Sequence, residues 1–117
     1  MIAHIRHLLQ FFAPHCREVE TNERLLKMID DRGSWQGAHN LFQHIRRKTL
    51  RAERASDDVG QAQYLFEEAC AKSLYNLSGA TAPFDADSPF WIASNALSLA
   101  RRLNLDPVEV VDILVEA

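Results

Sequence analysis

The stretch of sequence that decides the fold is SDDVGQAQYLFEEACAKSLYNLSG, residues 56–79. Its apolar residues recur every three to four positions, which predicts a single long helix. Ser56 stands at the start, Asp57 and Asp58 follow in the first turn, where carboxylates favour the positive end of the helix dipole, and Gly79 is placed to end the helix. The stripe that this helix turns toward a core is Val59, Ala62, Phe66, Ala69, Cys70, Ser73 and Leu77.

A second apolar stripe lies on the other side of this helix and consists of Tyr64, Ala71 and Tyr75. A helix that is apolar on two sides either runs through the middle of a bundle or presents one side to a partner. The pattern therefore predicts either a central position or an interaction surface.

Two further helices are expected toward the C-terminus. The run from Gly79 to Asp87 has no period and predicts a loop, and Ser88-Pro89 is a cap followed by a proline, which opens a helix. Asp106-Pro107 with Glu109 is the best-signalled helix start, and this last helix is expected to run to about Glu116. The helix that Ser88 opens turns one face toward the core, which consists of Ile92, Ala93, Ala96, Leu99, Ala100 and Leu103.

Three helices are expected before residue 56. The first carries an apolar stripe from Ile2 to Phe12 and is interrupted at Pro14. Thr21 or Asn22 is placed to cap a second helix that stops at the Gly33 turn. Ser34 then offers a cap for a third helix that reaches about Arg54, and its inner side is Trp35, Ala38, Leu41, Phe42, Ile45, Thr49 and Ala52.

These elements predict an all-α protein, a compact single domain over residues 1–117 with five to six short helices. No segment shows the period-two alternation of a strand. A composition that is 47% hydrophobic and 25% charged is that of an ordinary globular chain. Six side chains are predicted to be buried: Phe42, Ile45, Phe66, Cys70, Leu99 and Leu103.

The location predicted from the sequence is cytoplasmic. Polar residues such as His4 and Arg6 interrupt the apolar N-terminal segment, so it does not resemble a signal peptide, and no run approaches the ~20 apolar residues of a membrane span. Cys16 and Cys70 stand far apart in the chain and fit neither a CxxC site nor a disulfide framework. We therefore expect two reduced thiols and no membrane partner.

Charge is concentrated in one segment of the chain. Residues 46–54 hold four arginines and one lysine against Glu53, a net charge of +4, so the total of −3 leaves −7 elsewhere. Arg47, Arg51 and Arg54 project away from the core side of their helix, and neither Arg47 nor Arg51 has a glutamate four residues away. This face is either simply solvated or available to phosphates or an acidic protein surface.

Signatures of catalysis are missing from the sequence. There is no GxSxG elbow, phosphate loop or dinucleotide turn, and His4 and His7 lack the further ligands that a metal needs. We therefore expect no catalytic residues, no cofactor and no metal.

The function predicted from the sequence is a non-catalytic protein-interaction module, such as an adaptor, a regulator or an immunity or antitoxin-type protein, that binds a protein partner or a second copy of itself. Tyrosine, tryptophan and arginine are enriched in binding hot spots. The candidate binding residues are Arg47, Arg51, Arg54, Tyr64, Tyr75 and Trp91. The alternative is a nucleic-acid-binding regulator that uses the basic helix Arg46–Arg54, and a third class is a small helical enzyme or metal protein.

Overall fold

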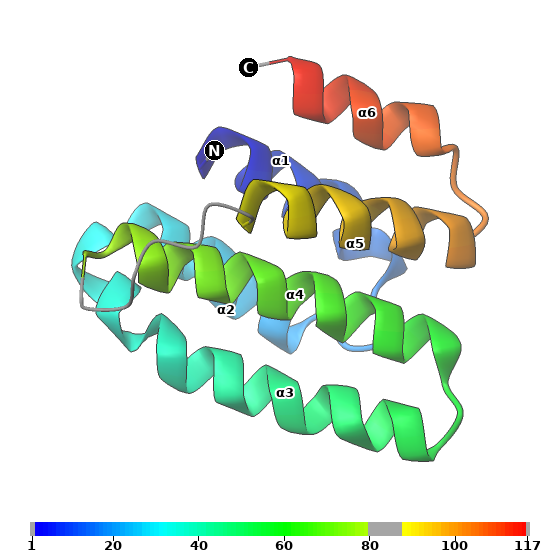
Figure 1. The fold of residues 1–117 in the computed structure, drawn as a ribbon, viewed down its shortest axis with the longest axis horizontal. Coiled ribbons are helices and arrows are strands. Elements are labelled where there is room, and N and C mark those ends of the chain that lie inside the picture. The colour runs from blue at the N-terminus through cyan, green and yellow to red at the C-terminus, as the bar shows by residue number, and fades with distance from the viewer. Residues whose placement is uncertain (1, 80–87, 117) are drawn as a thin grey trace.

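The computed structural model describes residues 2–79 and 88–116, and these residues form six α-helices and no strand (Figure 1). The prediction of an all-α bundle is confirmed. The helices are α1 (Ile2–Phe12), α2 (Glu20–Asp30), α3 (Ala38–Arg54), α4 (Asp58–Leu77), α5 (Ser88–Arg102) and α6 (Pro107–Val115), with short 3-10 turns at Ala13–His15 and Arg32–Gly37.

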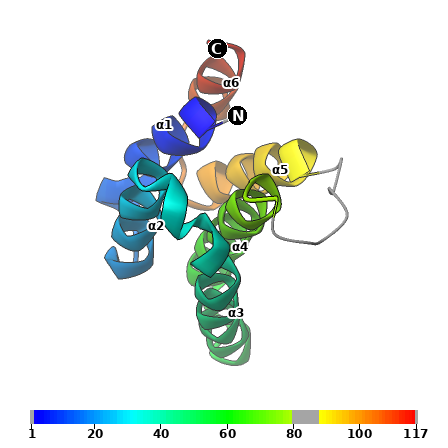
Figure 2. The ribbon, with the colours of Figure 1, turned by 90° about the vertical axis from the view of Figure 1, so that its left-hand side faces the viewer.

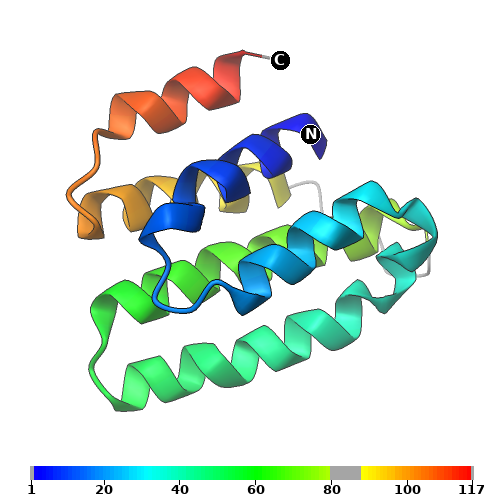
Figure 3. The ribbon, with the colours of Figure 1, turned by 180° about the vertical axis from the view of Figure 1, so that it is seen from behind.

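Helix α4 occupies the centre of the bundle, as the first of the two interpretations predicts. It packs against α2, α3 and α5, and Figure 2 shows these three helices around it. Tyr64 and Ala71 on one side are buried together with Phe66 and Cys70 on the other. Seen from behind, α1 and α2 cover the opposite side of the layer formed by α3, α4 and α5 (Figure 3).

Four of the six predicted core residues are buried: Ile45, Phe66, Cys70 and Leu99. The prediction is wrong for Phe42 and Leu103, which are only partly buried. Phe42 follows Leu41, which points directly into the core, and one residue along a helix turns the side chain by about 100°. Phe42 therefore reaches the edge of the contact between α3 and α4, and Leu103 lies just beyond the end of α5.

The last three helices begin where the sequence places them, although the capping residue of α4 differs. The Asp106 carboxylate accepts the Val108 backbone N–H at 2.9 Å and caps α6. Asp57, rather than Ser56, caps α4 by accepting the Gly60 N–H at 3.1 Å. Gly79 has a left-handed φ of 73° after the end of α4, as predicted, and the rest of the predicted loop before Ser88 lies outside the described residues.

The predicted caps of the second and third helices are wrong. Thr21 and Asn22 lie inside α2 and are buried, because both make tertiary hydrogen bonds; the Asn22 amide donates to the Leu9 carbonyl at 2.8 Å. Ser34 bonds back to the Asp31 carbonyl at 2.6 Å within the 3-10 turn, so α3 starts later, at Ala38. No helix in the described part of the chain is long and apolar enough to cross a membrane.

Candidate functional site

A groove runs along the face of the bundle formed by α3, α4 and α5, and we call it the aromatic groove. It consists of two hollows of about 200 and 270 Å³ that share Phe42 and Lys72. The first hollow is lined by Phe42, Leu65, Glu68, Ala69, Lys72, Trp91 and Asn95, and the second by His39, Phe42, Lys72, Tyr75 and Asn76. The lining is mostly apolar, with a few polar groups at its edges.

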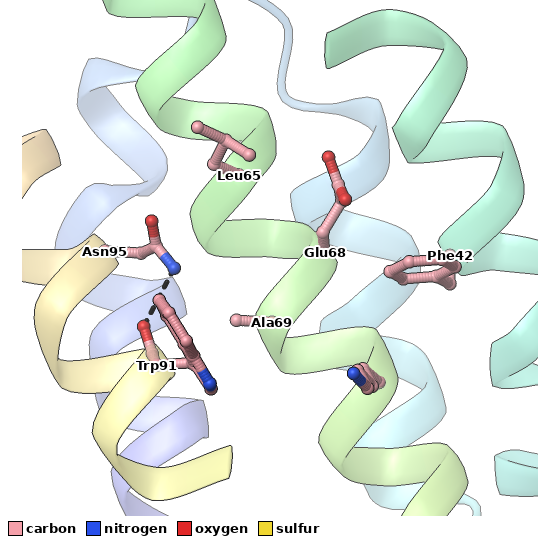
Figure 4. A pocket seen from close by; sticks show the side chains of 7 residues that line it. Phe42, Leu65, Glu68, Ala69, Trp91 and Asn95 are labelled. Atoms are coloured by element: carbon pink, nitrogen blue, oxygen red, sulfur yellow. Dashed lines mark hydrogen bonds between the residues drawn. The ribbon is translucent and has the colours of Figure 1, made fainter. Parts of the chain in front are cut away.

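Figure 4 shows how the first hollow is built. Trp91 stands on α5 and Phe42 on α3, and the short side chain of Ala69 leaves space between them on α4. The Asn95 amide donates to the Trp91 carbonyl at 2.9 Å within α5. The groove therefore has two aromatic walls and a floor of small and aliphatic side chains.

The groove takes in two of the six predicted binding residues. Trp91 is 51% exposed and its neighbour Phe90 is exposed as well, while Tyr75 is half-buried in the second hollow, where its ring lies 5.3 Å from that of His39. Tyr64 does not belong to this surface. It shares a stripe of α4 with Tyr75 but lies nearer the start of the helix, where it is only 5% exposed and the Lys48 ammonium stands 5.9 Å from its ring, so it serves the core rather than a partner.

The basic segment of α3 is divided by its neighbours in the fold. Arg46 reaches Glu68 at 3.3 Å on the groove side, and Lys48 reaches Glu18 at 3.0 Å on the other side. Within residues 2–79 and 88–116, no ion pair involves Arg47, Arg51 or Arg54, and all three are exposed. Three of the five cations of this segment therefore remain open to solvent.

Two neighbouring carboxylates of α4 are buried in separate polar networks. Glu67 is 1% exposed; it accepts the Thr21 hydroxyl and, at 3.2 Å, the Gln63 amide. Gln63 also bonds the backbone of Arg17 and Glu18, so this network fastens residues 17–21 to α4. Burial raises the pKa of Glu67 to about 7, although the hydrogen bonds from Thr21 and Gln63 oppose the shift.

Glu68 turns the other way, toward α3. Its carboxylate accepts the Thr49 hydroxyl at 2.5 Å and pairs with the Arg46 guanidinium, and it lines the first hollow of the groove. Because each carboxylate oxygen has a partner, Glu68 is held against α3 as a fixed part of the groove wall. The charge of Glu68 is largely neutralised by Arg46.

The thiols are poor nucleophiles in this fold. Burial, followed by the charge of Glu67, raises the pKa of Cys16 to about 12 and that of Cys70 well above its ordinary value. A protonated thiol neither attacks a carbonyl nor binds a metal strongly. Both cysteines are free, and the described residues contain no group of three metal-ligating side chains.

The sequence interpretation missed Glu67, Glu68 and the groove itself. Glu67 stands between the two apolar stripes of α4, and that position was a readable signal of burial. The groove had no such signal, because it depends on how far α3 and α5 stand apart across Ala69.

No protein-family model, no curated protein and no solved structure matches the chain.

Proposed function

We propose that this protein is a non-catalytic, cytoplasmic binding module that receives an amphipathic helix of a protein partner in the aromatic groove. The observation that carries the proposal is the exposed Trp91 beside an apolar hollow of about 200 Å³. Grooves of this kind hold the apolar face of a helix through anchors spaced at three to four residues. Exposed aromatic side chains at the edge of a hollow are typical anchors of such contacts.

The charge around the groove indicates which helix fits. Lys72 lines both hollows, and the carboxylate of Glu68, which lines the first, is buried against Arg46. Exposed arginines continue along the outer face of α3. We therefore expect a partner helix with acidic residues beside its apolar anchors, because electrostatic complementarity selects partners and speeds their encounter.

Two synthetic helical peptides test this proposal. They share one stripe of leucines and carry either glutamate or lysine at the flanking positions. The glutamate peptide should bind and shift the indole N–H signal of Trp91 in an NMR titration, and Trp91→Ala should lower its affinity by about tenfold or more. Equal binding of the lysine peptide, or undiminished binding to Trp91→Ala, would contradict the proposal.

Nucleic-acid binding is the second candidate, and the absence of an ion pair at Arg47, Arg51 and Arg54 within the described ranges is what favours it. Binding to duplex DNA should then weaken with a slope of about −0.9 per neutralised phosphate as salt rises, and each arginine-to-alanine change should flatten that slope by about one. We expect no such binding near ~150 mM salt, because the −7 carried outside residues 46–54 repels flanking phosphates. Salt-steep binding that the triple alanine variant abolishes would instead support the second candidate.

A further inference from the structure

Helix α6 carries an apolar stripe that none of the other described helices covers. Val108, Val111 and Val115 are 58%, 45% and 72% exposed, and they follow one another at three and four residues along one face. The opposite face holds α6 to the bundle through the buried Val110 and the partly buried Ile113 and Leu114. Helix α6 is therefore apolar on two faces, and among the residues that the structure describes only one of these faces has a partner.

The charges beside this stripe all have one sign. Residues 106–116 contain four acids, Asp106, Glu109, Asp112 and Glu116, and no lysine or arginine. None of these acids forms an ion pair with any residue that the structure describes. A second α6 is a poor partner for this face, because like charges would then stand opposite one another.

The aromatic groove has the complementary chemistry and sufficient length. It offers the aromatic walls of Phe42 and Trp91 with the cation Lys72 between its two hollows, and Arg46 stands at its edge, where it contacts Glu68. At about 1.5 Å per residue, the lining from Leu65 to Asn76 runs for about 16 Å along α4, and the stripe from Val108 to Val115 spans about 10 Å. The stripe is therefore shorter than the groove.

The groove cannot be filled by α6 of the same molecule. Figure 2 shows α6 at one end of the bundle, packed on α1 and α5, and α3 at the other end. The inward face of α6 is already used there, and Val108, Val111 and Val115 are exposed on its outer face. An α6 helix that fills the groove must therefore belong to another molecule.

We propose that the aromatic groove of one molecule binds the Val108, Val111 and Val115 face of α6 from a second copy of this chain. This rests on the proposed function, since it names the partner of the same groove. The contact joins two different surfaces, so each added molecule leaves one groove and one stripe open for the next. A standard interface buries about 800 Å² of surface on each partner, and a nine-residue helix covers much less. Association should therefore be weak, with a Kd in the micromolar range or above.

Sedimentation equilibrium of the full chain tests this directly. The average mass should rise above 13.3 kDa as protein concentration increases, and added salt should reduce the rise. Val111→Asp, which breaks the stripe, and Trp91→Ala, which breaks the groove, should each remain monomeric with unchanged circular dichroism. Val19→Asp, at an exposed valine outside both surfaces, should associate like the original protein.

Mixing the two deficient variants gives the decisive result. Val111→Asp keeps its groove and Trp91→Ala keeps its stripe, so an equimolar mixture should form a one-to-one dimer and nothing larger. A mixture that stays monomeric, or a mass that never rises, overturns this inference. If the glutamate peptide still binds at Trp91, the proposed function survives that failure. If neither the peptide nor a second copy of the chain binds, both the proposed function and this inference fail.

Discussion

Replacing Glu67 by glutamine should change how the stability of the protein depends on pH. The folded carboxyl has a pKa of about 7, against 4.5 when it is unfolded and solvated. Between these values the folded state holds a proton that the unfolded state releases, so the free energy of unfolding falls as pH rises through this window. Glutamine at position 67 has no proton to lose and removes this dependence.

The size of the effect follows from the shift. A pKa of about 7 in place of 4.5 corresponds to roughly 3 kcal/mol of stability that is lost as the pH rises from acid to neutral. Solvent barely screens this carboxyl, because Glu67 is only 1% exposed. Of this, roughly 2–3 kcal/mol should be lost between about pH 5 and about pH 8.

Urea denaturation followed by circular dichroism, at about pH 5 and about pH 8, measures this difference. The gap between Glu67→Gln and the original protein should move by roughly 2–3 kcal/mol in favour of glutamine at the higher pH. Glu23→Gln, which removes an exposed carboxyl of α2, is the control: its stability relative to the original protein should be the same at both pH values. Parallel pH profiles for Glu67→Gln and the original protein would show that Glu67 is not protonated in the fold and would refute the reasoning.

Core truncations and two glycine substitutions test the packing, all by thermal or urea denaturation. Phe66→Ala and Leu99→Ala should each cost about 2–5 kcal/mol through lost contacts and a cavity, and unaltered stability would contradict the core assignment. Gly60→Ala should give no gain, since its Cβ would lie 2.3 Å from the Asp57 carboxylate and displace the cap of α4. In Gly33→Ala the added Cβ meets only an ordinary contact at 3.5 Å, so this variant should be more stable than the original protein by about 0.4–1 kcal/mol. Equal effects of the two substitutions on stability would argue against the cap at Asp57.

Much of the fold was readable from local signals. Helical spacing set the number of helices, and Asp106 before Pro107 marked a start that the structure retains. The failures came at Thr21, Asn22 and Ser34, which local chemistry favours as caps. Thr21 and Asn22 instead bond to Glu67 and to the Leu9 carbonyl, partners that are 46 and 13 residues away, and distant partners leave no mark in the local pattern.

The candidate site was only half readable. Trp91 and Tyr75 stood out as aromatic residues beyond the core stripes, and both line the groove. Tyr64 has the same pattern and is buried, because it lies nearer the start of α4, where Lys48 of α3 and the segment before α2 surround it. Periodicity shows which residues share a face of a helix, but it does not show whether a neighbour covers that face.

The two adjacent carboxylates of α4 give a way to separate stability from binding. Glu67 faces α2 and takes no part in the groove, so Glu67→Gln should leave the affinity for the glutamate peptide unchanged. Glu68→Gln keeps an oxygen for the Thr49 hydroxyl but releases Arg46 from its only ion pair in the described ranges, which makes the groove more cationic. An ion pair of a half-exposed arginine contributes about 0.5–1 kcal/mol, so the glutamate peptide should bind Glu68→Gln roughly threefold more tightly. Isothermal titration calorimetry of both variants at one pH distinguishes them, and equal affinities, or weaker binding by Glu68→Gln, would mean that Arg46 does not contact the bound helix.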